Sequence, residues 1–259
     1  MKIRLLHGFT QNRMALTPFC RLLEVVTGVE VSVVEVPYHG DSRLAGRSLR
    51  EVSENLGELY GDHDCIFVGY SLGGRILLEA LASRTLESDG VIVFGAALDE
   101  GGEEARQARI EADKRLAAKV GAIVGKDDFE RFLIDWLKAP LFNGISRDQA
   151  QVNSRLTNEP KEIAKALRDL STGFQEGLLE RLKDVLSDRG VVNQPPKYRL
   201  GYIYGANDVK FKGVARNLKD QIDTIQIEEI ASCGHFTIGE RPYESAIAIS
   251  KIVQGWNVI

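Results

Sequence analysis

The sequence predicts an α/β fold, in which a mostly parallel sheet has helices on both faces and contains an inserted helical cap. Short, almost entirely apolar segments alternate with helical patterns at both ends of the chain, as in a parallel sheet that is buried on both faces. Between residues 99 and 190 the chain is rich in Ala, Glu, Arg, Lys and Leu and has no convincing strand pattern. We therefore expect an α/β core made of residues 1–98 and 191–259, and a helical cap made of residues 99–190.

The first part of the core alternates between predicted strands and predicted helices. Its β-branched and apolar runs predict strands at Ile3–Leu6, Val31–Val36, Cys65–Gly69 and Val91–Phe94. Apolar residues at helical spacing between these runs predict helices at Phe19–Val26, Leu49–Tyr60 and Leu72–Ala82. Neighbouring parallel strands need a crossover connection, and these helices supply it.

Helical patterns alone fill the insertion. The helices expected there are Glu103–Val120, Phe129–Leu137, Arg147–Leu156, Glu162–Leu170 and Leu178–Leu186. A proline pair then stops the helical pattern, and we interpret Gln194–Pro196 as the linker that returns to the core. Beyond it the alternation resumes, with strands expected at Tyr198–Tyr204 and Thr224–Ile230 and helices at Val214–Asp220 and Tyr243–Trp256.

The composition argues against several classes of protein. The chain has 259 residues and a net charge of −4, which is not the balance of a nucleic-acid-binding protein. No run of about 18 apolar residues occurs, so no membrane span is expected, and the N-terminus lacks the apolar stretch of a signal peptide. The three cysteines are too far apart in the sequence for the short spacing of metal ligands, and we interpret them as free thiols of a cytoplasmic protein.

The segment Gly69-Tyr70-Ser71-Leu72-Gly73 lies between a predicted strand and a predicted helix. Gly-x-Ser-x-Gly in this context is typical of the nucleophile elbow of the α/β-hydrolase fold, where small residues let the strand and the helix approach closely. The hydroxyl group of Ser71 would then stand above the sheet, and the backbone N–H of Leu72 would face a developing oxyanion. Ser71 is therefore the predicted catalytic serine.

A second oxyanion donor is expected from the loop after the first core strand. In this chain His7-Gly8-Phe9 directly follows the strand predicted at Ile3–Leu6, so the backbone N–H of Phe9 is the predicted donor. We expect His7 to be structural and to hold this loop by hydrogen bonds.

The partners of the serine should follow it in the order acid, then histidine. His235 lies after a late predicted strand and before the last helix, where the general base of this fold is expected. Asp208 follows another late strand and is the predicted acid that holds the second ring nitrogen of His235, with Asp99 as the alternative. The other three histidines lie too early in the chain or in a polar turn.

Several longer motifs extend over almost the whole chain. They are Leu6–Phe9, Gly69–Arg75, Arg106–Asp113, Trp136–Phe142, Ser171–Gln175, Gly205–Phe211 and Gly234–His235. Together they resemble the 2-succinyl-6-hydroxy-2,4-cyclohexadiene-1-carboxylate (SHCHC) synthase family. The resemblance implies a lyase of menaquinone or phylloquinone biosynthesis, which eliminates pyruvate from 2-succinyl-5-enolpyruvyl-6-hydroxy-3-cyclohexene-1-carboxylate. It implies that Ser71, with His235 and Asp208, removes a ring proton, and that no metal or organic cofactor is needed because the substrate ketone accepts the electrons.

A tricarboxylate of this kind needs fixed cations, and arginine binds carboxylates with two hydrogen bonds. Arg75 lies one helical turn after Ser71 on the same expected helix face. Arg106 and Arg109 are three residues apart on the first cap helix, so both are candidates to point down from it. The resemblance adds Arg155, which lies where the family carries a further substrate arginine. We expect all four to bind substrate.

Two aromatic residues complete the predicted substrate site. Tyr70, beside the catalytic serine, and Trp136, in the cap, are expected to contact the substrate ring. The chain also departs from the family pattern at two places. Pro37-Tyr38-His39-Gly40 replaces a usual Pro-Gly-His-Gly turn, and Phe236 follows the catalytic histidine where relatives often carry a small polar residue.

Two other functions use the same residues. A hydrolase that attacks an ester, thioester or carbon–carbon bond through nucleophilic Ser71 would need the same triad, although an apolar ester would not need the arginines. A ligand-binding receptor on a retained hydrolase scaffold is the second alternative, and an intact triad argues against it. The expected partner is a small tricarboxylate substrate, with no nucleic acid and no membrane, and the chain is expected to be a monomer or a weak homo-oligomer.

Overall fold

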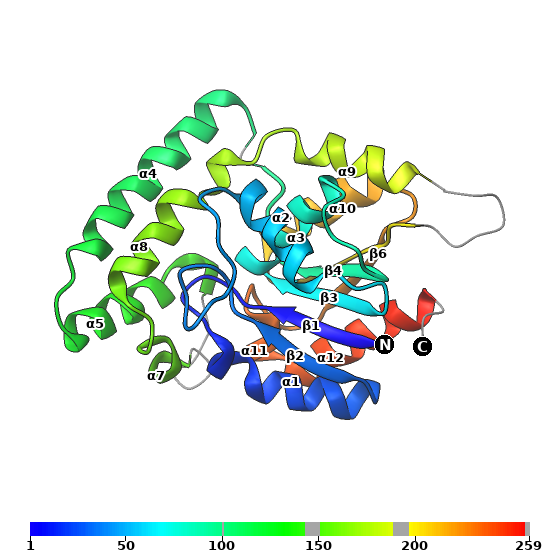
Figure 1. The fold of residues 1–259 in the computed structure, drawn as a ribbon, viewed down its shortest axis with the longest axis horizontal. Helices are drawn as coiled ribbons and strands as arrows, with labels where there is room; N and C mark the ends of the chain where they lie inside the picture. Colours follow the sequence, from blue (N-terminus) through cyan, green and yellow to red (C-terminus); the bar gives the residue numbers. More distant parts are fainter. Residues whose placement is uncertain (100, 143–150, 189–196, 257–259) are drawn as a thin grey trace.

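The computed structural model describes residues 1–99, 101–142, 151–188 and 197–256. Within these residues, one sheet of six parallel strands has the order β2-β1-β3-β4-β5-β6. The strands are β1 (Lys2–Leu6), β2 (Glu30–Val34), β3 (Cys65–Tyr70), β4 (Gly90–Phe94), β5 (Leu200–Gly205) and β6 (Gln226–Ile230). The predicted parallel α/β fold is confirmed, and the carboxyl ends of the strands share one edge of the sheet (Figure 1).

Helices cover both faces of this sheet (Figure 1). One face carries α1 (Arg13–Thr27), α11 (Thr237–Glu240) and α12 (Pro242–Gly255), which share an apolar cluster with the strands. The opposite face carries α2 (Leu49–Tyr60), α3 (Leu72–Ala82), α9 (Leu178–Ser187) and α10 (Val209–Gln221), which form a second cluster. None of the described helices has the length and apolar character needed to cross a membrane.

The two helices that begin five or six residues earlier than we predicted, α1 and α10, are each capped by a side chain. The side chain of Asn12 accepts the backbone N–H three residues later, so α1 starts directly after Asn12 and contains Pro18. The side chain of Asp208 accepts the backbone N–H of Phe211, so α10 starts directly after Asp208 rather than at Val214. The second cap matters for the site, because it fixes Asp208 at the end of β5.

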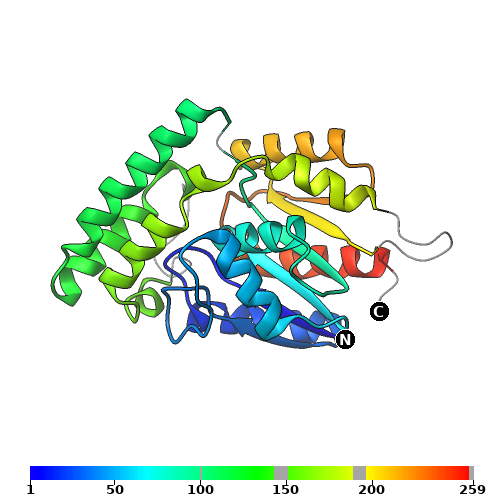
Figure 2. The same cartoon turned by 45° about the horizontal axis from the view of Figure 1, so that its top comes forward.

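A separate group of helices lies beyond the carboxyl edge of the sheet (Figure 2). It consists of α4 (Glu103–Gly121), α5 (Lys126–Leu137), η1 (Pro140–Phe142), α7 (Val152–Arg155), α8 (Pro160–Asp169) and η2 (Thr172–Phe174). α4 packs on α8 and η2, and the group has its own apolar cluster, which includes Val120, Leu133 and Ile163. We call the described residues of this group, 103–142 and 151–174, the helical cap. Residues 147–150 of the predicted helix Arg147–Leu156 lie outside the described residues.

The last helix of the predicted insertion packs on the core. α9 lies against α3, and its apolar side chains join the cluster on that face of the sheet. Arg181 of α9 donates two hydrogen bonds, each 2.8 Å long, to the buried carboxylate of Glu79 on α3. The predicted boundary at residue 190 and the linker Gln194–Pro196 lie outside the described residues, so the domain limits stay a prediction.

Candidate active site

Ser71 occupies a tight turn between β3 and α3. Its φ of +52° is in the left-handed region, which a residue with a side chain adopts only where the surroundings impose it. A Cβ atom on Gly69 would lie 2.6 Å from the backbone of Gly73, and one on Gly73 would lie 2.4 Å from the carbonyl oxygen of Leu6. The two glycines are therefore required for the close approach of strand and helix that raises Ser71 above the sheet.

Ser71, His235 and Asp208 form a chain of contacts at the carboxyl edge of the sheet. His235 Nε2 lies 3.3 Å from Ser71 Oγ, and His235 Nδ1 lies 3.0 Å from Asp208 Oδ2. Both His235 and Asp208 are buried, and the ring of Phe211 stacks on the imidazole with 4.7 Å between centroids. Asp99, the alternative acid, is exposed and accepts a hydrogen bond from the backbone of Gly101. This arrangement suits a general base whose tautomer is fixed by the aspartate.

Two backbone N–H groups lie beside the serine. Leu72 is the first residue of α3, so its N–H is one of the groups that an α-helix leaves without an internal acceptor. The loop that follows β1 places Phe9 at the same cavity as Ser71 and Leu72. Within the described residues, neither N–H forms a hydrogen bond. Two such donors suit the binding of a developing oxyanion.

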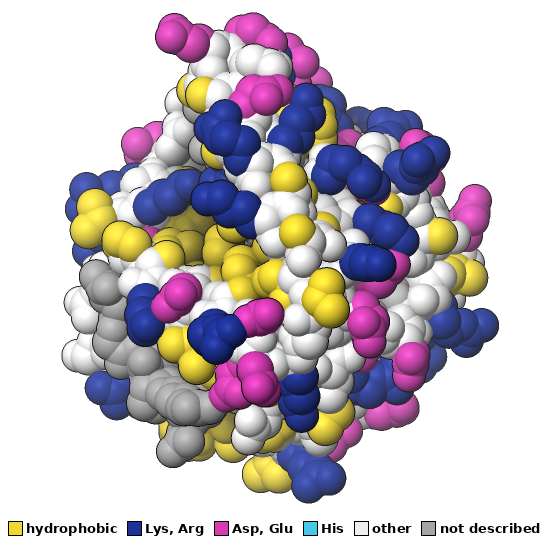
Figure 3. All heavy atoms as spheres, turned by 90° about the vertical axis from the view of Figure 1, so that its left-hand side faces the viewer, with side chains coloured by type: hydrophobic (Ala, Val, Ile, Leu, Met, Phe, Trp, Pro, Cys, Tyr) yellow, Lys and Arg dark blue, Asp and Glu magenta, His cyan; other side chains and the backbone are white. Residues whose placement is uncertain are grey.

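A cavity lies between the carboxyl edge of the sheet and the cap, and nine of the eleven predicted site residues line it. The nine are Phe9, Tyr70, Ser71, Leu72, Arg75, Arg109, Trp136, Arg155 and His235. Asp208 lies behind His235 and reaches the cavity only through it. Figure 3 shows the face on the cap side of the molecule, where Lys and Arg side chains border an apolar hollow.

Arg106 differs from the other predicted arginines because it does not line this cavity. Its guanidinium group forms ion pairs with Glu103, one turn earlier on α4, and with Glu176, after η2. These carboxylates raise the pKa of Arg106 above its usual value. Arg106 therefore joins α4 to the segment after η2, and we leave it out of the proposed substrate site.

Arg75 is buried on α3 and is held by neutral acceptors from the insertion. Its Nε donates to the side-chain oxygen of Gln175, and its NH2 group donates to the carbonyl oxygen of Leu170 at 2.6 Å. Gln175 is itself fixed, because its amide donates to the carbonyl oxygens of Ala97 and Leu98 at 3.1 and 2.9 Å. These contacts hold the guanidinium group in a fixed orientation at the cavity wall.

Arg109 reaches the cavity from the cap. Its Nε lies 2.9 Å from Asp113 Oδ2 on the next turn of α4, and the same oxygen accepts the hydroxyl group of Ser171 at 2.6 Å. Asp113 is buried, whereas the side chain of Arg109 is 38% exposed. The aspartate therefore orients an arginine that lines the cavity.

Arg155, at the end of α7, is the most deeply buried of the cavity arginines, with 3% of its surface exposed. Its NH1 group donates to the carbonyl oxygen of Phe9 at 3.2 Å and to the hydroxyl oxygen of Thr10. Burial lowers the pKa of Arg155 to about 10, so the group is still charged at pH 7. A cationic side chain from the cap thus contacts the loop that carries an oxyanion donor.

Tyr70 and Trp136 bring polar atoms to an otherwise aromatic wall. The hydroxyl group of Tyr70 and the indole N–H of Trp136 are buried and form no hydrogen bond within the described residues. Burial also raises the pKa of Tyr70 above its usual value. Buried polar groups are normally satisfied, so both atoms are suited to bind a polar group of a ligand. The Trp136 ring contacts Phe9 edge-on, with 5.2 Å between centroids.

Sequence reasoning missed several polar residues of this site, and three of them carry a charge or an amide group. Asp113 and Lys210 line the cavity, and Gln175 holds Arg75. All three lie inside the motifs that resemble the SHCHC synthase family. Their spacing in the sequence, however, does not predict which residues they contact. Lys210 follows Asp208 by two residues at the start of α10, which is the only local signal of its position.

Comparisons with known proteins agree on the fold. The model of the alpha/beta hydrolase family matches residues 5–248. A 2-succinyl-6-hydroxy-2,4-cyclohexadiene-1-carboxylate synthase from Enterobacter sp. (strain 638) is 27% identical over 227 residues, which are 85% of this chain and 80% of that protein. The synthase of the same name from Klebsiella pneumoniae is 25% identical and covers 96% of this chain and 92% of its own. The solved structure of MenH from S. aureus has a TM-score of 0.83 at 23% identity, over 99% of this chain and 94% of that one.

Proposed function

Because the chain belongs to the alpha/beta hydrolase family, we propose that its serine site carries out an elimination, as an SHCHC synthase. The proposed reaction releases pyruvate from 2-succinyl-5-enolpyruvyl-6-hydroxy-3-cyclohexene-1-carboxylate and leaves SHCHC, in the biosynthesis of menaquinone or phylloquinone. Relatives named as this synthase, which align over most of the chain, support the proposal.

The observation that carries the proposal is the charge of the cavity beside Ser71. Arg75, Arg109 and Arg155 come from three different elements, and all three line the cavity that the serine faces. Arginine recognises carboxylates through paired, charge-assisted hydrogen bonds. Three fixed cations suit a tricarboxylate, whereas an apolar ester would gain nothing from them.

In the proposed mechanism, Ser71 acts as a base rather than as a nucleophile. Ser71 Oγ takes a ring proton next to the succinyl ketone while His235 Nε2 takes the serine's own proton, and Asp208 stabilises the resulting imidazolium. The electron pair moves onto the ketone oxygen, where the N–H groups of Phe9 and Leu72 stabilise the enolate. The pair then forms a C2=C3 double bond, the C3=C4 double bond of the ring shifts to C4=C5, and the bond from C5 to the enolpyruvyl oxygen breaks. The leaving enolate takes up a proton on carbon and becomes pyruvate.

A hydrolase is the second candidate, because the same triad and donors serve acyl transfer. In that reaction Ser71 Oγ would bond to a carbonyl carbon, and the two N–H groups would stabilise a tetrahedral oxyanion. The arginines favour the elimination over the hydrolysis of an apolar ester.

Release of pyruvate from the enolpyruvyl substrate is the direct test. We expect the purified protein to release one pyruvate for each SHCHC formed, which a coupled lactate dehydrogenase assay and the absorbance of the product measure together. p-Nitrophenyl esters are the matched control for hydrolase activity, and we expect little turnover of them. Rapid ester hydrolysis without pyruvate release would contradict the elimination.

Replacing Arg109 with alanine should lower kcat/KM for pyruvate release about 100-fold, since a charge-assisted contact with a substrate carboxylate is lost. Steady-state pyruvate release over a range of substrate concentrations measures this. Arg115→Ala is the matched control, because Arg115 is exposed on the same helix and does not line the cavity. Equal kinetics for both variants would remove Arg109 from the substrate site.

A further inference from the structure

The loop that carries the oxyanion donor Phe9 is held by side chains on two sides. Thr10, the next residue, has a φ of +64°, a left-handed conformation that costs free energy and persists only where neighbours impose it. Thr10 is fully buried. Its backbone N–H donates to His39 Nε2 at 3.0 Å, and its carbonyl oxygen accepts from Asn158 Nδ2 at 2.7 Å. Both hydrogen-bonding groups of this backbone residue are therefore fixed by side chains.

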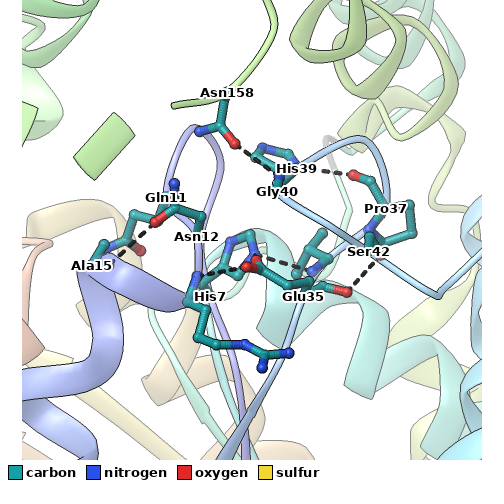
Figure 4. Close-up of polar contacts among 12 residues, drawn as sticks. His7, Gln11, Asn12, Ala15, Glu35, Pro37, His39, Gly40, Ser42 and Asn158 are labelled. Carbon is teal, nitrogen blue, oxygen red and sulfur yellow. Dashed lines mark hydrogen bonds and ion pairs between the residues drawn. The ribbon is translucent and has the colours of Figure 1, made fainter. Parts of the chain in front are cut away.

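His39 can accept this hydrogen bond because one ring tautomer is imposed on it. Its Nδ1 lies 2.8 Å from the carbonyl oxygen of Pro37, so Nδ1 carries the proton and Nε2 is an acceptor (Figure 4). Burial lowers the pKa of His39 to about 3, and the neighbouring His7 and Arg155 act in the same direction. The imidazole is thus neutral at pH 7, with its Nε2 lone pair directed at Thr10.

Asn158 joins this loop to the turn that carries His39. It lies between α7 and α8 of the cap and is 4% exposed. While its Nδ2 donates to Thr10, its Oδ1 accepts the backbone N–H of Gly40 at 3.0 Å (Figure 4). One cap side chain therefore bridges two core loops, 7–10 and 37–40, and Asn158 does not line the cavity itself.

We propose that Asn158 is a positioning residue, which holds the Phe9 N–H in its oxyanion-binding orientation by fixing the carbonyl group of Thr10 against the His39 turn. The peptide between Phe9 and Thr10 is held at its oxygen by Arg155 and at its nitrogen by His39, and Asn158 fixes the following carbonyl. Rotation of that segment would turn the Phe9 N–H away from the cavity. The Phe9 N–H, which donates to the enolate, is therefore held in the right orientation only when the cap packs on the core.

The kinetic test rests on the proposed function, and it separates catalysis from binding. We expect Asn158→Ala to lower kcat for pyruvate release about 10- to 100-fold, because a donor displaced by about an ångström loses much of its effect. We expect KM to change less than about threefold, because Asn158 does not line the cavity. Asn158→Asp keeps an acceptor for Gly40 but sets a carboxylate oxygen against the Thr10 carbonyl, so its kcat should fall at least as far.

Tyr38→Phe is the matched control. The hydroxyl group of Tyr38 lies 2.8 Å from Asp169 Oδ2, so this variant also removes a hydrogen bond between core and cap, but none to residues 7–10. We expect its kcat to stay within about threefold of the wild type. An unchanged kcat in Asn158→Asp, or an equal loss in Tyr38→Phe, would overturn the proposal, as would a rise in KM with kcat unchanged.

A spectroscopic measurement tests the same residue without any substrate. In protein labelled with ¹⁵N-phenylalanine, the Phe9 amide is identified by its loss in Phe9→Leu. We expect its chemical shift to move in Asn158→Ala and to stay unchanged in Tyr38→Phe. An unmoved Phe9 amide in the folded Asn158→Ala protein would refute the positioning role. A wild type that releases no pyruvate would instead refute the proposed function and leave this measurement valid.

Discussion

Replacing Ser71 with alanine should lower kcat for pyruvate release about 10⁴-fold, the largest loss that we expect from any single substitution. The variant keeps the backbone and the oxyanion donors but removes the oxygen that takes the ring proton, and with it the contact to His235. Alanine also has a Cβ atom, so the left-handed turn at this position is no more strained than in the wild type. Single-turnover and steady-state pyruvate release both measure the loss.

The control for this prediction is the double variant Ser71→Ala/His235→Ala. Residues that act as one unit are far from additive, so we expect the double variant to be about as slow as Ser71→Ala alone. If the kcat loss of the double variant equalled the product of the losses in the two single variants, the two residues would act independently, which would contradict their shared role. Mass spectrometry of the quenched wild-type reaction adds a second criterion, because a serine that acts as a base forms no acyl-enzyme and a nucleophilic serine does.

Gly95→Ala should lower kcat about 100-fold by displacing the catalytic histidine. A Cβ atom on Gly95 would lie 2.8 Å from both Cε1 and Nδ1 of His235, a distance that carbon atoms do not tolerate. The same Cβ atom would lie 3.8 Å from the ring of Phe211, which stacks on the imidazole, so the space around the histidine is already filled on that side. We therefore expect His235 to move away from Ser71, and proton transfer is sensitive to such a displacement. Pyruvate release and a crystal structure of the variant would show both effects.

Gly177→Ala is the matched control, because it adds the same strain without the contact. Gly95 has a φ of +51° and Gly177 a φ of +59°, so alanine costs about 1 kcal/mol or more of stability at either position. A Cβ atom on Gly177 would meet no atom within 4 Å. We expect both variants to lose thermal stability but only Gly95→Ala to lose kcat. A normal kcat in Gly95→Ala would show that His235 adapts to the added methyl group.

Local sequence signals were sufficient to predict the sheet and the serine turn. Gly69, Ser71 and Gly73 form a motif whose conformation depends on a few neighbouring residues, so its place between strand and helix is readable from the sequence. Asp208 and His235 follow late strands, and parallel strands bring their carboxyl ends to one edge. The start of α1 was less predictable, because a proline at position 18 reads as a helix boundary while the cap at Asn12 overrides it.

Contacts between distant segments were beyond sequence reasoning. Gln175 meets Arg75 across 100 residues of chain, and Asn158 meets Thr10 across 148. Such pairs depend on how the cap packs on the core, which no periodicity encodes. The same reason explains Arg106, whose charge pattern on α4 resembles that of Arg109 although its guanidinium group turns to Glu103 and Glu176 instead.

The ion pair between Arg181 and Glu79 limits which part of the insertion can be exchanged between relatives. α9 follows the cap in the sequence, yet it shields part of the face of the sheet on which α3 lies. In a chimaera, the whole insertion, including α9, would be replaced by that of a relative. This exchange would uncover that face and leave the carboxylate of Glu79 without its guanidinium partner. We therefore expect the helical cap to be exchangeable between relatives only when α9 is kept together with the sheet.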